Sequence, residues 1–387
     1  MRRLISGVGD FFKTSDKTLW ICTLIATVYS ALMLSSVERA GGSFVRNQVI
    51  AAIIGYIIAI ILSMIDYEYL ARYWYIAAGI SLVLFASVFL FGVTVAGTDD
   101  TAWLRLPGGL TFQPSELVKI CFIVTFAKHL DTLKKNEKLH TFLAVMSLLV
   151  HAMIPVAIIH FQGDDGSALI FLCIALIMMF TAGVQARYFV ILTCVLSVGI
   201  PVLWNVIMND EHRNRILALA DLDGNALTDY GYQQYQSKVS IASGGKSGYG
   251  LGEGYRTGLG AVPEQENDFI FSVAGEELGF FGTMLVIVLI LLIIFKTFTN
   301  ATKARDDLGS YICFGMFGLL ASQSIINIAM VIGMLPVIGI TLPFFSAGGS
   351  SAMCLYFGIG LVQSVRIHNK DVDNIKLSYT RNERIKI

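Results

Sequence analysis

The side chains best placed for chemistry are carboxylates that lie next to apolar segments. Asp268 directly precedes the run Phe-Ile-Phe at 269–271, so we expect protein or lipid to exclude part of the water around it. Burial of this kind raises the pKa of a carboxyl group and makes it a better base near neutral pH. Glu276 and Glu277 follow closely, but acidic residues also favour helix N-termini, and we interpret this pair as helix-starting residues. The pattern therefore nominates Asp268 as a general base.

A second candidate pair, Glu116 and Lys119, interrupts an otherwise apolar stretch. Residues three apart share one face of a helix and can pair. Ionisable residues within membrane spans are usually functional. Two interpretations stay open: the pair lines a polar cavity, or it is an ion pair that fixes the helix in a bundle. Asp164 and Asp165 lie in a turn between apolar segments, where we expect them to be solvated, although Asp164 is also a candidate for the same cavity.

A glycine-rich segment follows in the chain, with eight glycines among the seventeen residues from Gly244 to Gly260. Glycine permits close backbone approach and exposes N–H groups, which suits an anionic headgroup. Three cations lie nearby: Lys238, Lys246 and Arg256. A plain flexible connector is the alternative. Nucleotide binding is excluded, because the P-loop-like run Gly-Gly-Lys-Ser at 244–247 has Ser240 where the motif requires glycine.

The amino-acid composition indicates the class of protein that holds these residues. The chain has 387 residues, of which 55% are hydrophobic and only 14% charged, and its mean hydropathy is +0.68. A soluble domain carries roughly a quarter charged residues, so most of this surface faces lipid. Nucleic acid is excluded as a partner because no basic patch or stripe is present. The six cysteines have no metal-ligand spacing, and no metal site is predicted.

Apolar segments long enough to cross a bilayer core of about 30 Å predict ten transmembrane helices and an all-α polytopic fold. The predicted spans are Leu19–Ser36, Val49–Met64, Trp74–Gly97, Leu117–Ala127 with its upstream flank, Thr141–His160, Ser167–Gly183, Tyr188–Met208, Leu278–Phe295, Tyr311–Leu335 and Ser350–Val365. Gln323 and Asn327 lie one turn apart in the ninth span, and such amides more often bridge helices than touch substrate.

Lysine and arginine set the orientation, because cytoplasmic segments are enriched in them. With both termini inside, the cytoplasmic segments hold nineteen such residues and the short outer loops hold three. We therefore expect a multi-pass protein of the bacterial cytoplasmic membrane with both termini cytoplasmic. Residues 1–365 form one transmembrane domain, and residues 366–387 form a basic cytoplasmic tail that contacts anionic membrane lipid. The long segment 209–276, between helices 7 and 8, then lies outside, and a loop of this length is usually functional or disordered.

Several runs together resemble the SEDS family (shape, elongation, division and sporulation), the membrane-embedded peptidoglycan glycosyltransferases that include RodA and FtsW. The matching runs are Phe112-Gln-Pro-Ser-Glu-Leu-Val-Lys119, Gln162-Gly-Asp-Asp-Gly-Ser-Ala168, Tyr232-Gln-x-x-Gln-Ser237 with Ser243-Gly-Gly245, Pro263-Glu-x-x-x-Asp-Phe-Ile-Phe271 with Gly275-Glu-Glu-Leu-Gly279, and Leu342-Pro-Phe-Phe-Ser-x-Gly-Gly-Ser-Ser351. They occur in family order and cover most of the chain from about 95 to 365.

The resemblance implies an inverting enzyme that polymerises lipid II, a polyprenyl-diphosphate-linked disaccharide peptide, at the outer membrane face. The Pro-Phe-Phe-Ser form of the last motif favours the RodA-like branch, which serves cell elongation and rod shape. The family's essential aspartate falls on Asp268, and its transmembrane Glu and Lys fall on Glu116 and Lys119. A class B penicillin-binding protein is the expected partner. The expected substrate-binding residues are Glu116, Lys119, Asp164, Gln233, Gln236, Ser237, Lys238, Lys246, Arg256 and Glu264.

In the expected reaction Asp268 activates the acceptor hydroxyl, while Lys238, Lys246, Arg256 and Arg213 are candidates to balance the charge on the leaving diphosphate. No cofactor is certain, and Mg²⁺ is the metal that phosphate oxygens plus one carboxylate would suit. Two alternatives stay open: a lipid II flippase or other transporter, and a non-catalytic scaffold of the cell-wall machinery. We see no convincing internal repeat of the kind that transporters show.

Overall fold

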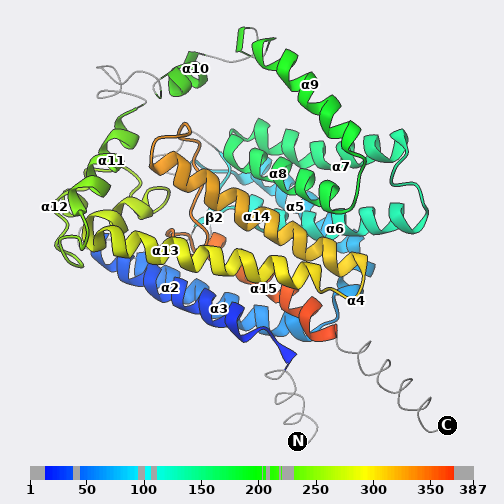
Figure 1. Cartoon of the computed structure of the whole chain (residues 1–387), viewed down its shortest axis with the longest axis horizontal. Coiled ribbons are helices and arrows are strands. Elements are labelled where there is room, and N and C mark those ends of the chain that lie inside the picture. The colour runs from blue at the N-terminus through cyan, green and yellow to red at the C-terminus, as the bar shows by residue number, and fades with distance from the viewer. Residues whose placement is uncertain are drawn as a thin grey trace, which may run out of the picture.

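The computed structural model describes residues 14–37, 44–94, 101–105, 111–202, 204–205, 210–217, 219 and 231–369. Over these ranges the chain is almost entirely helical, and long helices pack side by side in a bundle (Figure 1). The helices of the first half are α2 (Lys17–Val37), α3 (Phe44–Met64), α4 (Tyr67–Arg72), α5 (Trp74–Phe91), α6 (Pro114–Lys135), α7 (Phe142–Phe161), α8 (Asp165–Thr181) and α9 (Ala186–Val202).

The second half adds α10 (Asp210–Leu217), α11 (Tyr232–Gly244), α12 (Tyr255–Gly258), α13 (Ile270–Thr302), α14 (Asp307–Val331) and α15 (Gly349–His368). Between α5 and α6, the short strands β1 (Leu104–Arg105) and β2 (Thr111–Phe112) pair antiparallel, with Leu104 opposite Phe112. The segment from α10 to α12 belongs to the long loop predicted between the seventh and eighth spans.

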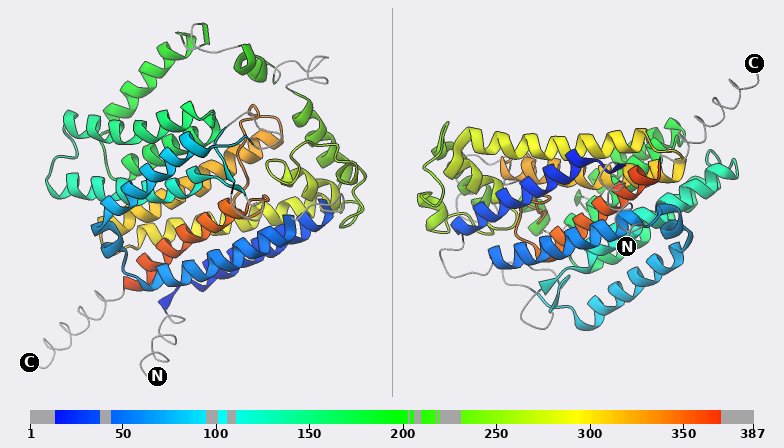
Figure 2. Two further views of the ribbon diagram at one scale, coloured as in Figure 1. Left: turned by 180° about the vertical axis from the view of Figure 1, so that it is seen from behind. Right: turned by 90° about the horizontal axis from the view of Figure 1, so that it is seen from below.

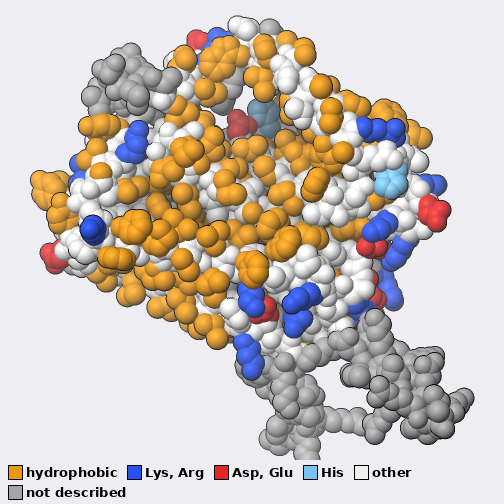
Figure 3. Space-filling view, viewed as in Figure 1, with side chains coloured by type: hydrophobic (Ala, Val, Ile, Leu, Met, Phe, Trp, Pro, Cys, Tyr) orange, Lys and Arg blue, Asp and Glu red, His pale blue; other side chains and the backbone are white. Residues whose placement is uncertain are grey.

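Each of the ten predicted spans corresponds to a helix, which confirms the all-α polytopic fold. Within the described residues, six helices are long and apolar enough to cross a membrane: α2, α3, α5, α7, α13 and α14. Two further apolar helices, α8 and α9, are shorter. The remaining two are α6, which carries Glu116 and Lys119, and α15. Hydrophobic side chains cover most of the face drawn in Figure 3, and charged ones gather at its right-hand edge.

Several span boundaries differ from the prediction, for local reasons. The predicted third span ran to Gly97, but α5 ends at Phe91 because Gly92 turns to extended backbone (φ −60°, ψ 140°). The ninth was predicted to reach Leu335, whereas α14 ends at Val331 and is followed by Gly333 with a φ of +77°. The fourth was the shortest in the prediction, yet α6 runs for 22 residues, because Pro114 starts it and its charges pair inside the bundle.

Helix α9 differs from the other long helices because none of its residues is buried. Both the view in Figure 1 and the reverse view in Figure 2 show it leaving the body of the bundle. Its exposed side chains include Val190, Ile191, Val195 and Val198, so lipid is the medium that suits this helix. The molecule therefore consists of a packed bundle with one helix set apart.

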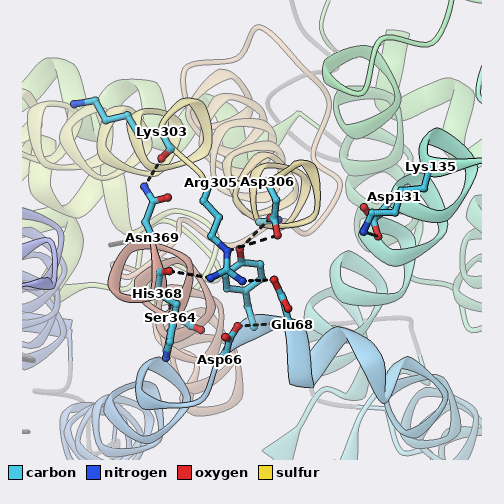
Figure 4. Close-up of polar contacts among 12 residues, drawn as sticks. Asp66, Glu68, Asp131, Lys135, Lys303, Arg305, Asp306, Ser364, His368 and Asn369 are labelled. Atoms are coloured by element: carbon cyan, nitrogen blue, oxygen red, sulfur yellow. Dashed lines mark hydrogen bonds and ion pairs between the residues drawn. The ribbon is translucent and has the colours of Figure 1, made fainter. Parts of the chain in front are cut away.

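A network of polar contacts fixes the end of the bundle that lies away from α11 and α12 (Figure 4). Arg305, in the turn between α13 and α14, pairs with Glu68 of α4 and donates to the carbonyl of His368 at 3.3 Å. Asp306 caps α14 by accepting from Gly309 N at 2.8 Å and from the Tyr67 hydroxyl at 3.0 Å. These bonds tie three elements that are far apart in sequence and leave the opposite end to the candidate site.

Candidate functional site

Helix α6 brings the predicted pair Glu116 and Lys119 together in the interior. Pro114 occupies its first turn, where the fixed φ of proline and its missing N–H cost nothing. Lys119 Nζ lies 2.7 Å from Glu116 Oε1, and the two side chains are 1% and 6% exposed. Ser351, at the start of α15, donates to the other oxygen of Glu116 at 3.4 Å. The pair thus links α6 to α15, two helices whose motifs are 235 residues apart.

Asp164 was expected to be solvated in its turn, but it is buried. Its residue is 6% exposed, and its Oδ1 caps α8 by accepting from Ser167 N at 2.9 Å. Its Oδ2 accepts from Gln113 Nε2 at 2.8 Å, and Ser115 Oγ lies 3.5 Å away. Asp164 therefore joins the start of α8 to the start of α6, and of the two neighbouring aspartates only Asp165, with a side chain that is 42% exposed, is partly open to solvent.

The non-helical segment 332–348, between α14 and α15, packs against this group. A Cβ on Gly166 would lie 2.3 Å from the carbonyl oxygen of Ile338, so only glycine allows α8 to approach so closely. Gln113 N also donates to Ser350 Oγ at 3.3 Å. We call Glu116, Lys119 and Asp164, with their contacts in 332–351, the inner group.

Asp268 lies on the loop that leads from α12 into α13, and it faces the same segment. It is half-buried, and a Cβ on Gly339 would lie 3.8 Å from its Oδ2. The carbonyl of Asp268 accepts from Asn327 Nδ2 at 2.8 Å, and the carbonyl of Glu266 accepts from Ala347 N at 2.7 Å. The segment 332–348 therefore contacts both α8, close to its cap Asp164, and the loop that carries Asp268.

The other predicted residue of this loop, Glu264, shapes its backbone. Glu264 has a φ of +55°, its carbonyl accepts from the N–H groups of Asn267 and Phe269, and its Oε2 accepts from Asn267 Nδ2 at 2.7 Å. Burial raises the pKa of the neighbouring Glu266 carboxyl above its ordinary value, and the Glu264 carboxylate adds to this rise. The turn that presents Asp268 is thus tightly bonded within itself.

Helix α11 carries four predicted residues, and only one of them is fully buried. Ser237 donates to the carbonyl of Val331 at 2.9 Å, at the C-terminus of α14. Lys238 is exposed and packs on Gly333, where a Cβ would lie 3.2 Å from its Nζ. Gln233 and Gln236 are partly exposed. Ser237 thus docks the helix, while the other three side chains remain accessible.

Sequence reasoning missed Gln234, which does more of the docking than its neighbours. Its Nε2 donates to the carbonyl of Met330 at 3.1 Å and also to that of Leu335. The available signal was its helical spacing, because Gln234 precedes Ser237 by three residues and so shares its face. Gln113 was missed in the same way, although it stood inside a recognised motif.

The cation of Arg256 is already engaged with α11. Its Nε donates to Ser240 Oγ at 3.0 Å, and its guanidinium also donates to Gln236 Oε1. Lys246 is exposed, and its carbonyl accepts from Phe281 N at 3.3 Å. Arg213 Nε donates to the carbonyl of Trp204 at 2.8 Å, within the segment near α10. We call Gln236, Ser237, Lys238 and Arg256 the outer group.

Glu276 and Glu277 are not helix-starting residues, because α13 begins at Ile270. They are 1% and 0% exposed, and they receive the N–H groups of the glycine-rich segment. Glu276 accepts from Arg256 N at 2.7 Å, from Thr257 N at 3.0 Å and from Thr257 Oγ1 at 2.9 Å. Glu277 accepts from Gly252 N at 3.0 Å and from the hydroxyl of Ser36. Several of the donors expected to meet an anionic headgroup are therefore occupied by the chain's own carboxylates.

A break in α13 adds two further hydrogen bonds to the glycine-rich segment. Gly279 has non-helical backbone (φ 61°, ψ −155°), and the N–H groups of Phe280 and Phe281 donate instead to Gly245 and Lys246. The glycine-rich segment is thus a folded element held on α13, and the flexible-connector interpretation is wrong.

The fold and these buried polar groups define a polytopic, all-helical integral membrane protein with polar clusters at one end of its bundle. Residues 16–371 match the family model described as cell cycle protein, of FtsW, RodA and SpoVE. The chain belongs to this family, which is the SEDS family predicted from its motifs, and it is therefore a multi-pass protein of the bacterial membrane.

Relatives agree over nearly the full length of the chain. It is 35% identical to the probable peptidoglycan glycosyltransferase FtsW of Geobacter sulfurreducens, over 89% of this chain and 91% of that one. It is 32% identical to the peptidoglycan glycosyltransferase MrdB of Escherichia coli, over 92% of this chain and 94% of that one.

Solved structures share the fold. A chain from a study of structural coordination of polymerization and crosslinking by a peptidoglycan synthase complex superposes with a TM-score of 0.78 at 25% identity, covering 92% of this chain and 98% of that one. The rod shape determining protein RodA of Thermus thermophilus superposes with a TM-score of 0.67 at 24% identity, covering 92% and 97%. The second likeness concerns the fold alone.

Proposed function

We propose that this chain polymerises lipid II into glycan strands at the outer face of the cytoplasmic membrane, with Asp268 as the general base, for cell elongation. The general activity rests on the family: the chain is a peptidoglycan glycosyltransferase of cell-wall synthesis, as the two relatives above are named. The role of each residue is the proposal. The relatives include both FtsW and MrdB, so the elongation branch rests on the Pro-Phe-Phe-Ser motif at 343–346.

One observation carries the assignment of Asp268. Its loop is bonded to the segment 332–348 through Asn327 and Ala347, and that segment also packs on the helix that Asp164 caps. A half-buried carboxylate is thereby held against the same segment whose Gly333 contacts the exposed Lys238 of α11. This is the arrangement that a general base needs when its substrate has a lipid tail and a charged headgroup.

The chemistry requires one base. The acceptor sugar hydroxyl of one lipid II attacks the anomeric carbon of the other, a new C–O bond forms, and the bond from that carbon to the diphosphate oxygen breaks. Asp268 takes the hydroxyl proton and later releases it to water. Inversion at the anomeric carbon needs only one carboxylate opposite the leaving group, unlike the pair that a glycosidase uses. General-base assistance of this kind is typically worth about 10²–10⁴-fold in rate.

The leaving diphosphate needs positive charge. Lys238 and Lys246 are exposed, and Arg256 is held by Gln236 and Ser240, so we assign the charge-balancing role to these three cations. Gln233 and Glu264 complete the headgroup contacts. Within the described ranges no three His, Cys, Asp or Glu side chains converge to hold a metal ion. A Mg²⁺ ion held by the phosphate oxygens of the substrate and one carboxylate, as expected from the sequence, would need no such group.

The orientation and the partner belong to the same proposal. The excess of lysine and arginine in the segments expected inside supports cytoplasmic termini, and with this orientation α11, α12 and the Asp268 loop lie outside. Residues 1–365 then act as one transmembrane unit. One superposed chain comes from a peptidoglycan synthase complex that coordinates polymerization and crosslinking, and this supports a class B penicillin-binding protein as the crosslinking partner.

The test uses the purified full chain in detergent with labelled lipid II. We expect polymer from the wild type and at least a 10²-fold loss in Asp268→Asn, which keeps the shape and removes the base. The matched control is Asp307→Asn, an exposed aspartate that pairs with Lys134 at the other end of the bundle and should retain activity. Full polymerisation by folded Asp268→Asn would remove Asp268 from this role, and a wild type that binds lipid II without making polymer would favour the transporter or scaffold.

A further inference from the structure

Asn327 lies in the last turns of α14 and makes two hydrogen bonds that join separate parts of the site. Its Nδ2 donates to the carbonyl of Asp268 at 2.8 Å and to the carbonyl of Ile340 at 2.6 Å. Carbonyl oxygens only accept, so the amide group must point its two hydrogens at them, and its orientation is fixed by its partners. The side chain is 0% exposed, which keeps water from competing for either bond.

The second bond, to Ile340, holds the backbone that the Asp268 carboxylate faces, because Gly339 precedes Ile340. Gly339 has a φ of +66°, and its missing Cβ would lie 3.8 Å from Asp268 Oδ2. Asn327 therefore holds both the backbone that carries the Asp268 side chain and the backbone that the carboxylate faces. Asn327 is thus one link between these segments, and the bond from Ala347 N to the carbonyl of Glu266 is another.

The amide oxygen of Asn327 indicates that a contribution to stability does not by itself account for an asparagine at this position. Its Oδ1 is buried and has no hydrogen-bond partner among the described residues. A buried acceptor without a donor is a cost to folding, and buried polar groups that stay unsatisfied call for a functional explanation. The neighbouring Gln323 donates to Thr341 Oγ1 of the same segment at 3.1 Å, and the described residues show no hydrogen bond from it to the Asp268 loop.

We propose that Asn327 is a positioning residue for Asp268: it sets the direction of the carboxylate toward the acceptor hydroxyl without touching substrate. This inference rests on the proposed role of Asp268 as the base. Proton transfer requires the base within hydrogen-bond reach of its proton, and a shift of about 1 Å in a reacting group can cost on the order of 10²-fold in rate. Substrate binding, which falls to the inner and outer groups, should be much less sensitive.

The test compares kcat and KM for lipid II polymerisation in Asn327→Leu, which keeps the approximate shape and removes both donors. We expect kcat to fall by about 10–10² while KM stays within about threefold, because transition-state alignment is lost and ground-state binding is not. The matched control is Asn300→Leu, a buried asparagine of α13 that donates to Asp16 Oδ2 at 3.3 Å, and it should leave both constants near the wild type.

A double variant separates positioning from a structural role. If Asn327 acts only through the carboxylate, adding Asn327→Leu to Asp268→Asn should lower the residual rate by less than about twofold, since residues that act as a unit are not additive. A multiplicative fall, or an unchanged kcat in Asn327→Leu, would overturn the inference. Retained activity in Asp268→Asn alone would instead remove the base on which it rests. If Asn327→Leu is recovered unfolded, Asn327→Ser decides, with one donor left and an expected intermediate kcat.

Discussion

Gln113 donates a hydrogen bond of 2.8 Å from its Nε2 to Oδ2 of Asp164, and so joins two motifs that lie 51 residues apart in sequence. The same carboxylate caps α8 through its other oxygen. Because Gln113 is the N-cap residue of α6, the N-termini of two helices are joined at one buried aspartate. As the N-cap of α8, Asp164 lies where the positive end of the helix dipole favours a carboxylate side chain.

This relationship predicts a measurable loss of stability in Asp164→Ala. The variant loses the helix cap, worth about 0.5–2 kcal/mol, and leaves the Gln113 amide without its acceptor in the interior. We expect a loss of about 2 kcal/mol in the free energy of unfolding, followed as a lower thermal midpoint in detergent. Asp164→Asn keeps an acceptor for Ser167 and should lose less than half as much; equal midpoints for wild type and alanine would contradict the assignment.

The buried pair of Glu116 and Lys119 makes a second prediction. Removing one partner leaves an uncompensated charge in the interior, which typically costs about 3–5 kcal/mol. Glu116→Gln leaves the charge of Lys119, which is 1% exposed, without its partner. It should therefore lower the thermal midpoint more than Lys119→Met does. The double variant Glu116→Gln, Lys119→Met, which leaves neither charge, should recover most of the lost stability.

Activity then distinguishes the two interpretations of this pair. A double variant that is stable and still polymerises lipid II would make the pair an ion pair that only fixes α6. A stable but inactive one supports its place in the substrate-binding group. No recovery of the thermal midpoint would mean that other contacts of the pair, such as the bond from Ser351 to Glu116, matter more for stability than the ion pair.

The sequence predicted the fold well because the bilayer imposes a length on every apolar span. Hydropathy located all ten helices, and the lysine and arginine counts set their expected orientation without any knowledge of packing. The boundaries were less accurate where a single backbone turn ends a helix, as at Gly92 and Gly333. Such turns depend on local φ and ψ, which glycine allows but does not require.

Contacts between distant segments could not be predicted from residue types. The glycine-rich segment was expected to offer N–H donors to an anionic headgroup, but the N–H groups of Gly252, Arg256 and Thr257 donate to Glu277 and Glu276 of the same chain. Likewise, Gln234 and not the predicted Gln233 faces α14. In both cases the residue type was informative, and the partner was set by how α11 folds back on α13 and α14.

The hydrogen bonds that Glu276 accepts from the glycine-rich segment give a third prediction. Glu276→Gln keeps one acceptor oxygen and replaces the other by an NH₂ group, so either Arg256 N or the N–H and hydroxyl of Thr257 lose their acceptor. We expect faster amide hydrogen exchange across residues 245–258, with little change in the helices, because only the local bonds are lost. Glu253→Gln serves as the control, since Glu253 is exposed in the same segment. Unaltered exchange in Glu276→Gln would show that the glycine-rich segment does not depend on this carboxylate.

The fourth prediction concerns pH and the carboxyl group of Glu266, beside the proposed base. Burial raises its pKa from the ordinary 4.5, and the Glu264 carboxylate adds to the rise. The folded protein therefore holds this proton more tightly than the unfolded chain, so the corresponding stability is fully present below pH 4.5 and is lost as pH rises through the folded pKa. Glu266→Gln mimics the protonated form at every pH and lacks this dependence.

The comparison of thermal midpoints should show this sign directly. Wild type and Glu266→Gln should have similar midpoints at the acid end, and the wild type should fall behind the variant as pH rises above 4.5. The gap should become constant once the carboxyl group is ionised in both states, because the two states then bind the same number of protons. Glu253→Gln, measured in parallel, accounts for the loss of a carboxylate from the surface. A wild type that instead gains on Glu266→Gln with rising pH would mean that a cation stabilises the Glu266 carboxylate, and the loop that carries Asp268 would then be held by charge pairing and not by burial.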